Sequence, residues 1–236
     1  MDTGNVNVPK GFDSFGPWFS EAFELFKAQW QGWVVLFLVY MLIVGVISFV
    51  LNMIFPLLGI LVAIPAALMM PGMVKAGLNQ IRGGKVELSD LFSGTDMFVG
   101  ALVVAIVMSA GVIACGIGVY VTSTLFFLSL PLLVDRKLSI GDALTQSMNV
   151  TKQNFFFFLV YMLVMGIVSG IGSIACGVGV LATAPIAFLG MLVAYERTFN
   201  AASAAAPAPQ DPPAPPAPAA PEAPAQPETP EAPPEQ

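Results

Sequence analysis

Three long stretches of the chain contain no charged residue: residues 28–74, 97–134 and 153–195, which are 47, 38 and 43 residues long. One helix needs about 20 apolar residues to cross about 30 Å of hydrocarbon. Each stretch is therefore too long for one crossing and suits two crossings joined by a turn. Residues 52–59, 111–118 and 170–179 carry the Gly, Pro and Asn that favour turns. The pattern predicts an all-α polytopic membrane protein, with six transmembrane helices arranged as three hairpins.

The basic residues are placed as this arrangement requires, because cytoplasmic loops of membrane proteins collect Lys and Arg. With three hairpins, all nine lie on one side of the membrane, whereas single crossings would divide them five to four. The nine are Lys10, Lys27, Lys75, Arg82, Lys85, Arg136, Lys137, Lys152 and Arg197. We therefore expect both termini in the cytoplasm and three uncharged turns on the outer side.

A short related segment precedes each hairpin, with the sequences FSEAF at 19–23, LSDLF at 88–92 and IGDAL at 140–144. Asp90 and Asp142 each lie three residues after a polar residue, Glu87 or Ser139, which is typical of a capped helix N-terminus. We expect these segments to form interfacial helices. In the first, apolar residues recur at three- and four-residue steps and predict a face that enters the headgroup layer. They are Phe15, Trp18, Phe19, Ala22, Phe23, Phe26 and Trp30.

The chain repeats itself. Residues 111–136 return 61 positions later as residues 172–197, and 15 of the 35 positions from 102 to 136 are identical to their counterparts. The hexapeptide FLVYML at 37–42 also returns, at 158–163. We interpret the chain as three copies of one unit, an interfacial helix followed by a hairpin.

Three regions follow from these patterns. Residues 1–32 form a cytoplasmic N-terminus with the amphipathic helix, and residues 33–199 form the six-helix transmembrane domain. Residues 200–236 form a Pro- and Ala-rich acidic tail without aromatic or basic side chains, which we expect to be disordered and cytoplasmic. The first 30 residues lack the basic start and short apolar core of a cleavable signal, so we expect no cleavage there.

Composition excludes several classes of function. The chain is 56% hydrophobic and only 10% charged, whereas about a quarter of the residues of a soluble domain are charged. It has no His and only two Cys, so we expect no metal site and no cofactor. No basic patch of the kind that binds nucleic acid is present in the sequence. The lipid bilayer is the expected environment, and an enzyme is disfavoured.

Two pairs of residues suggest specific contacts. Cys115 and Cys176 occupy equivalent places in the repeat, near the outer face, where disulfides persist. They either form a disulfide or pack as two small apolar side chains. Gly166 and Gly170 form a GxxxG pattern, which would bring a second copy of the chain close, pack within the chain, or reflect the glycine content of such helices.

Polar residues inside the predicted helices offer a further candidate site. Residues 122–124, Thr122, Ser123 and Thr124, are the densest group. Their hydroxyl groups either bond to carbonyls of their own helix or line a path for a solute. The pairs at 135–136 and 196–197 end the second and third stretches, and we expect solvated charges there, with ion pairs within or between the repeats as the alternative.

Three segments carry a resemblance to known families: LSDLF at 88–92, PLLVDRKLSIGDALTQSMNVTKQNF at 131–155 and CGVGVLATAPIAFLGMLVAYERTF at 176–199. Over about residues 15–200 the chain resembles bacterial inner-membrane proteins, namely the YciC-like proteins and the membrane domain of glycerophosphodiester phosphodiesterases. The resemblance implies a membrane module in the bacterial inner membrane. In those phosphodiesterases the chemistry belongs to a separate soluble domain rich in His and acidic residues, which this sequence lacks.

The sequence thus favours a non-enzymatic structural or accessory inner-membrane protein that assembles with itself or with a membrane-protein partner. The alternative is a passive transporter or channel for a small solute or a lipid. All Asp, Glu, Lys and Arg residues are assigned outside the predicted helices, so we expect no coupling of transport to protons.

Overall fold

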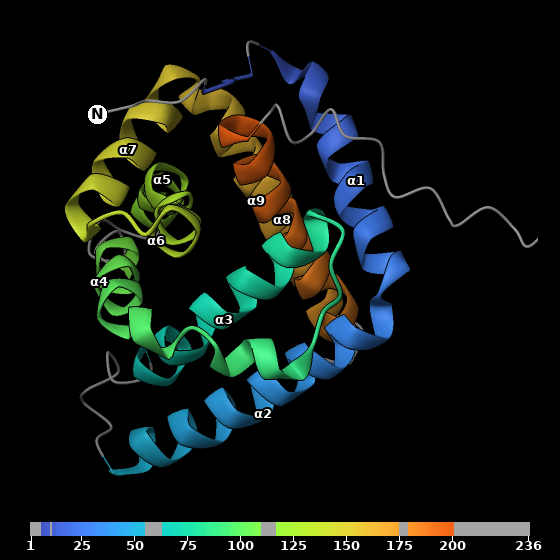
Figure 1. Ribbon diagram of the computed structural model, residues 1–236, viewed down its shortest axis with the longest axis vertical. Coiled ribbons are helices and arrows are strands. Elements are labelled where there is room, and N and C mark those ends of the chain that lie inside the picture. The colour runs from blue at the N-terminus through green and yellow to red at the C-terminus, as the bar shows by residue number, and fades with distance from the viewer. Residues whose placement is uncertain (1–5, 10, 55–62, 110–116, 175–178, 201–236) are drawn as a thin grey trace, which may run out of the picture. The chain divides into compact units, whose positions relative to one another are not determined.

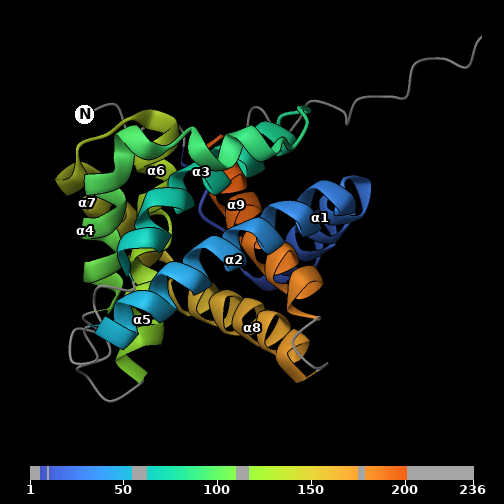
Figure 2. The same cartoon turned by 90° about the horizontal axis from the view of Figure 1, so that it is seen from below.

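A computed structural model of the chain describes residues 6–9, 11–54, 63–109, 117–174 and 179–200. These residues form helices joined by short loops, and no strand occurs among them, which confirms the predicted all-α class for this part of the chain. Figures 1 and 2 show their arrangement. In chain order they are η1 (Phe12–Ser14), α1 (Phe15–Ala28), α2 (Trp30–Ile54), α3 (Ala63–Ile81), η3 (Leu88–Phe92), η4 (Thr95–Met97), α4 (Phe98–Ser109), α5 (Ile117–Phe126), α6 (Ser129–Arg136), α7 (Ile140–Gln153), α8 (Phe155–Ile174) and α9 (Val180–Phe199).

Several of these helices indicate a membrane protein. Within the described residues, five stretches are long and apolar enough to cross a membrane: Trp30–Ile54, Leu88–Ser109, Gly118–Arg136, Phe155–Ser173 and Val180–Phe199. α3 is not one of them, because Lys75, Asn79 and Gln80 make its C-terminal half polar. The six-helix arrangement therefore stays a prediction. Most of the predicted turn residues lie outside the described ones. α8 continues to Ile174, so the first residues of the predicted third turn are helical.

Exposed apolar side chains are concentrated on α2 and α8, the first helices of the first and third predicted hairpins. On α2 no residue after Phe37 is buried, and Phe49 and Met53 are 71% and 79% exposed. α9 is the opposite, because nearly all of its residues from Pro185 onward are buried. An apolar surface of this extent is costly in water, whereas lipid removes the cost. The exposed faces of α2 and α8 are thus suited to contact with a bilayer.

The sequence repeat is visible as a repeated hydrogen bond. The Oγ1 atom of Thr122 on α5 donates to the carbonyl oxygen of Met108 on α4 at 3.0 Å. The Oγ1 atom of Thr183 on α9 donates to the carbonyl oxygen of Ser169 on α8 at 3.2 Å. Donors and acceptors are both 61 positions apart. The helix pairs α4–α5 and α8–α9 therefore pack in the same antiparallel register.

Contacts between the three predicted units follow a cyclic order. α3 contacts α4, α5 contacts α8, and α9 contacts α2, so the second helix of each unit packs on the first helix of the next. The connecting segments follow the same rule: η3 packs on α3, α7 on α5 and α6, and α1 on α9. Figure 1 shows the result, with α3 and α9 in the interior and α1, α2, α4 and α7 around them. The last predicted unit therefore packs on the first, through the contacts of α9 with α1 and α2.

Two connecting segments begin with the predicted caps. The Ser139 Oγ atom accepts a hydrogen bond from the Asp142 backbone N–H at 3.2 Å at the start of α7. Glu87 and Asp90 form a capping box at the start of η3. Each bond satisfies a backbone N–H that the first turn of a helix leaves free. The sequence signal for these helix starts is confirmed.

α1 differs from its prediction in what covers its apolar face. Trp18, Ala22 and Phe26 are buried, and the Trp18 ring lies 5.4 Å from that of Phe157 on α8. The apolar face of α1 thus packs on α8 and α9, and these helices cover it in place of lipid. Phe23, expected on the same face, is 42% exposed. α2 begins at Trp30, three residues before the predicted domain boundary at residue 33.

A break separates α5 from α6 within one candidate span. Pro131 lacks a backbone N–H, and its ring clashes with the carbonyl four residues earlier, which explains a break at residues 127–128. The nearby carbonyl oxygen of Leu125 accepts hydrogen bonds from Ser147 Oγ at 2.7 Å and Thr151 Oγ1 at 3.2 Å, both on α7. α7 therefore contacts the break through two hydrogen bonds to a partly buried backbone acceptor.

Candidate functional site

The C-terminal ends of α3, α6 and α9 meet at one guanidinium group. Arg82, which directly follows α3, donates two hydrogen bonds to Asp135 of α6, from Nη1 to Oδ1 at 2.7 Å and from Nη2 to Oδ2 at 2.9 Å. It donates two more to Glu196 of α9, from Nε to Oε1 at 3.2 Å and from Nη2 to Oε2 at 3.0 Å. Asp135 and Glu196 are equivalent in the repeat. Arg82 thus joins one helix from each of the three units.

We call Arg82, Asp135, Glu196 and Tyr195 the Arg82 cluster. Its side chains are 39% exposed at Arg82, 15% at Asp135 and only 4% at Glu196, so the two carboxylates are poorly solvated. The Tyr195 hydroxyl donates to Asp135 Oδ2 at 2.8 Å, and the Asn200 amide donates to Glu196 Oε2 at 3.1 Å. Each acid therefore has a second donor besides Arg82.

Charge and hydrogen bonding fix the ionisation of Arg82. The hydrogen bonds to Asp135, ahead of those to Glu196 and of the two negative charges, raise the pKa of the Arg82 guanidinium above its ordinary value, although partial burial lowers it. Arg82 is therefore a permanent cation between two carboxylates. Such a group balances charge and orients helices.

The arginines that follow the two acids bind different partners. Arg197 forms a bidentate ion pair with Glu21 of α1, from Nε to Oε2 at 2.9 Å and from Nη2 to Oε1 at 2.7 Å. Arg136 instead donates to the carbonyl oxygen of Phe199 at 3.0 Å, and its guanidinium lies 5.1 Å from the centre of that ring. Arg197 therefore holds α1 on α9, and Arg136 holds the end of α9 on α6.

This arrangement supports cohesion between helices. Arg82 donates four hydrogen bonds, all to the carboxylates of Asp135 and Glu196, so the cation and both acids are paired with one another. Among the described residues, no group of three or more His, Cys, Asp or Glu side chains is placed to hold a metal ion. The chemistry of the cluster is that of a tether between three helices.

The predicted polar group on α5 is bonded to the backbone. Thr122 Oγ1 lies 2.9 Å from the Gly118 carbonyl oxygen, in addition to its bond to Met108, and Thr124 Oγ1 donates to the Tyr120 carbonyl oxygen at 2.7 Å. Thr124 is fully buried and Ser123 is half-buried. Both threonines thus follow the first of the two alternatives, in which the hydroxyl group bonds to helix carbonyls.

Gly166 and Gly170 lie on an exposed face of α8. A methyl group built at Gly170 would meet no atom within 4 Å, and one at Gly166 would only reach Tyr120 at 4.0 Å. No close contact with another described helix occurs at either glycine, and the alternatives for this pattern stay predictions. Cys115 and Cys176 lie outside the described residues, so a disulfide between them stays a prediction.

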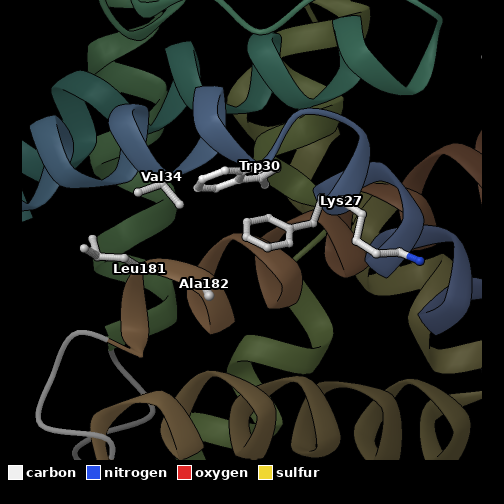
Figure 3. A pocket seen from close by; sticks show the side chains of 6 residues that line it. Lys27, Trp30, Val34, Leu181 and Ala182 are labelled. Carbon is white, nitrogen blue, oxygen red and sulfur yellow. The ribbon is translucent and has the colours of Figure 1, made fainter.

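A pocket of about 390 Å³ lies where the junction of α1 and α2 meets the start of α9 (Figure 3). It is lined by Phe26, Lys27, Trp30, Val34, Leu181 and Ala182. The junction is a break at Gln29, whose backbone leaves the helical range (φ −135°, ψ 40°). The Gln29 side chain donates to the Gly84 carbonyl oxygen at 3.0 Å and accepts from the Val86 N–H at 2.8 Å, so the break is held in place.

Neither Arg82 nor the pocket could be singled out from the sequence, where Arg82 is one of nine predicted cytoplasmic cations. The available signal is the pair of equivalent acids at positions 135 and 196, which suggests similar surroundings for both. The pocket is formed by segments about 150 residues apart, between Phe26 and Leu181, and no local pattern joins them.

Comparisons with protein-family models, with curated proteins and with solved structures found no match to this chain.

Proposed function

We propose that the protein is a non-enzymatic structural or accessory component of the bacterial inner membrane, with six transmembrane helices and both termini in the cytoplasm. The observation that carries the proposal is the Arg82 cluster. A guanidinium group with four donor contacts to two acids of its own chain holds helices together and is not available to a substrate. The hydroxyl groups of Thr122 and Thr124 are likewise bonded to backbone carbonyls.

The proposed family relationship is that of the YciC-like proteins and the phosphodiesterase membrane domains. Support comes from where the three similar segments fall. They form η3, the stretch from α6 to the start of α8, and α9, which are elements that make the contacts between units. A membrane module that assembles with itself or with another membrane protein agrees with the exposed apolar faces of α2 and α8.

A passive transporter remains the second candidate, favoured by the pocket beside Lys27. A pocket of about 390 Å³ is within the range of about 300–1,000 Å³ that small-molecule sites occupy. Its apolar lining fits a lipid better than a polar solute. This candidate would use the pocket, because Thr122 and Thr124, the alternative polar lining on α5, are bonded to backbone carbonyls.

Flux through liposomes separates the two candidates. We expect reconstituted protein to give no solute flux above that of empty liposomes, and no substrate-dependent proton flux. The triple variant Thr122→Ala, Ser123→Ala, Thr124→Ala should also stay at background. Flux by the wild type above that of empty liposomes would establish the transporter and defeat the structural proposal, and a loss of that flux in the triple variant would place the path at α5 and not at the pocket.

Reporter fusions test the proposed topology. Fusions after Asn52, Gly116 and Ser173 should give the signal of the outer compartment, because the turns carry no Lys or Arg. Fusions after Lys85, Lys137 and Asn200 should give the cytoplasmic signal, and serve as matched controls at the C-terminal end of each predicted hairpin. A cytoplasmic signal from any of the three turns would rule out the hairpin arrangement.

A further inference from the structure

We propose that α1 is a movable arm, which pivots at Gln29 between its place on α8 and α9 and the lipid headgroup layer, and that polar contacts hold it on the protein. The inference goes beyond the proposed function, because such an arm serves a structural protein and a transporter equally.

The break at Gln29 is not encoded by the residues around it. No Pro occurs between residues 18 and 55, and Gln is a good helix former, so the local sequence favours one continuous helix through α1 and α2. In such a helix the Gln29 backbone N–H would bond to the Leu25 carbonyl oxygen. It bonds to the Phe26 carbonyl oxygen at 3.3 Å instead, which leaves the Leu25 carbonyl for another donor. Contacts from elsewhere in the chain therefore set the angle between α1 and α2.

Two glutamines supply these contacts, and we call Gln29 and Gln80 the glutamine clamp. Gln80 of α3 is 4% exposed and reaches both sides of the break. Its Nε2 atom donates to the Leu25 carbonyl oxygen at 2.6 Å, and its Oε1 atom accepts from the Trp33 indole N–H at 2.6 Å. Gln29 bonds in the opposite direction, to the backbone of residues 84 and 86, which follow α3. The clamp thus holds the pivot at its present angle.

A second polar contact holds the middle of α1. It is the Glu21–Arg197 ion pair with α9, whose side chains are 25% and 28% exposed. α1 lies at the edge of the bundle (Figures 1 and 2), so it can leave α9 without displacing another helix. Loss of the clamp and of this ion pair would therefore free the arm.

The apolar face of α1 gives little preference between protein and lipid. Trp18, Ala22 and Phe26 are buried, while Glu24 and Lys27 are exposed, at 64% and 50%. An amphipathic helix of this kind is also stable in the headgroup layer, with its apolar face towards the acyl chains. Lipid tails are as apolar as the side chains of a helix, so the hydrophobic effect does not decide between the two positions. The polar contacts decide.

Distances between two spin labels test the arm in the full chain, reconstituted in lipid nanodiscs. The labels are attached at Ser20→Cys on α1 and Thr145→Cys on α7, both exposed positions, in a parent chain that carries Cys115→Ala and Cys176→Ala. We expect one distance in this parent. Adding Glu21→Gln and Gln80→Leu should raise the ratio of released to docked arm about 100-fold, since each change removes hydrogen bonds that contribute about ten-fold. A second distance should then appear.

The matched control combines Glu24→Gln with Gln153→Leu, which change an exposed acid of α1 and an exposed glutamine of α7. It should keep the single distance. An unchanged distance in Glu21→Gln, Gln80→Leu would show that apolar packing holds α1 and would overturn the proposal, as would a second distance of equal weight in the control. A loss of helix content by circular dichroism would also overturn it, because the arm would then unfold and not move. If Gln80→Leu fails to fold, Glu21→Gln alone still decides, because the second distance must then appear with this change.

Discussion

Replacing Arg82 with alanine should destabilise the helical domain by about 2–3 kcal/mol, which corresponds to a fall in melting temperature of roughly 5–10 °C. The change leaves Glu196, which is 4% exposed, and Asp135, which is 15% exposed, beside each other without their shared cation. Removing one member of a fully buried pair costs about 3–5 kcal/mol, and the 39% exposure of Arg82 reduces that figure. Thermal unfolding in detergent, followed by circular dichroism, measures the effect.

Two further variants assign the loss to the cluster. Lys85→Ala removes an exposed cation three residues away and should change stability by no more than about 0.5 kcal/mol. Combining Arg82→Ala with Glu196→Gln should be less damaging than the sum of the two changes, because the second removes a charge that the first leaves uncompensated. Equal melting temperatures for Arg82→Ala and Lys85→Ala would show that Arg82 does not tether the helices.

Gly172→Ala should cost about 2–4 kcal/mol, combining overpacking with the loss of a hydrogen bond. A methyl group at Gly172 on α8 would collide with the Thr183 Oγ1 atom of α9 and lie 2.6 Å from the backbone of Gly179 and Val180. Backbone atoms cannot rotate away, so the two helices must separate. The repeated bond from Thr183 to the Ser169 carbonyl would be lost with them.

Gly170→Ala is the matched control on the same helix, because its added methyl group meets nothing within 4 Å. We expect this variant to be as stable as the wild type or up to about 1 kcal/mol more stable, through the higher helix propensity of alanine. If both alanine variants melt with the wild type, the close contact of α8 and α9 at Gly172 is refuted.

The elements that could be predicted from the sequence are those governed by local patterns. The runs without charge predicted the apolar helices. The spacing of Ser139 and Asp142 predicted the start of α7, because a helix cap depends only on neighbouring residues. The 61-residue repeat predicted equivalent helix pairs, and the bonds of Thr122 and Thr183 show that equivalence at atomic detail.

The contacts between units could not be predicted in the same way. Arg82 pairs with acids 53 and 114 positions away, and no periodicity in the sequence indicates which cation they share. The burial of Trp18 against α8 has the same origin, since an amphipathic face is equally suited to lipid and to another helix. The pocket lies at the break at Gln29, whose side chain bonds to the distant residues Gly84 and Val86.

The packing of α1 on α9 sets an order of events during synthesis. The partners in the Glu21–Arg197 ion pair are 176 positions apart, so at about 5–20 residues per second the ribosome needs roughly 9–35 s between making one and making the other. Until α8 and α9 have been made, the apolar side of α1 lacks the two helices that cover it in the folded protein, and we expect it to rest on lipid. We expect α1 to leave the lipid and pack on α9 once α9 has been made. The Glu21–Arg197 ion pair, and with it the final position of α1, therefore forms last.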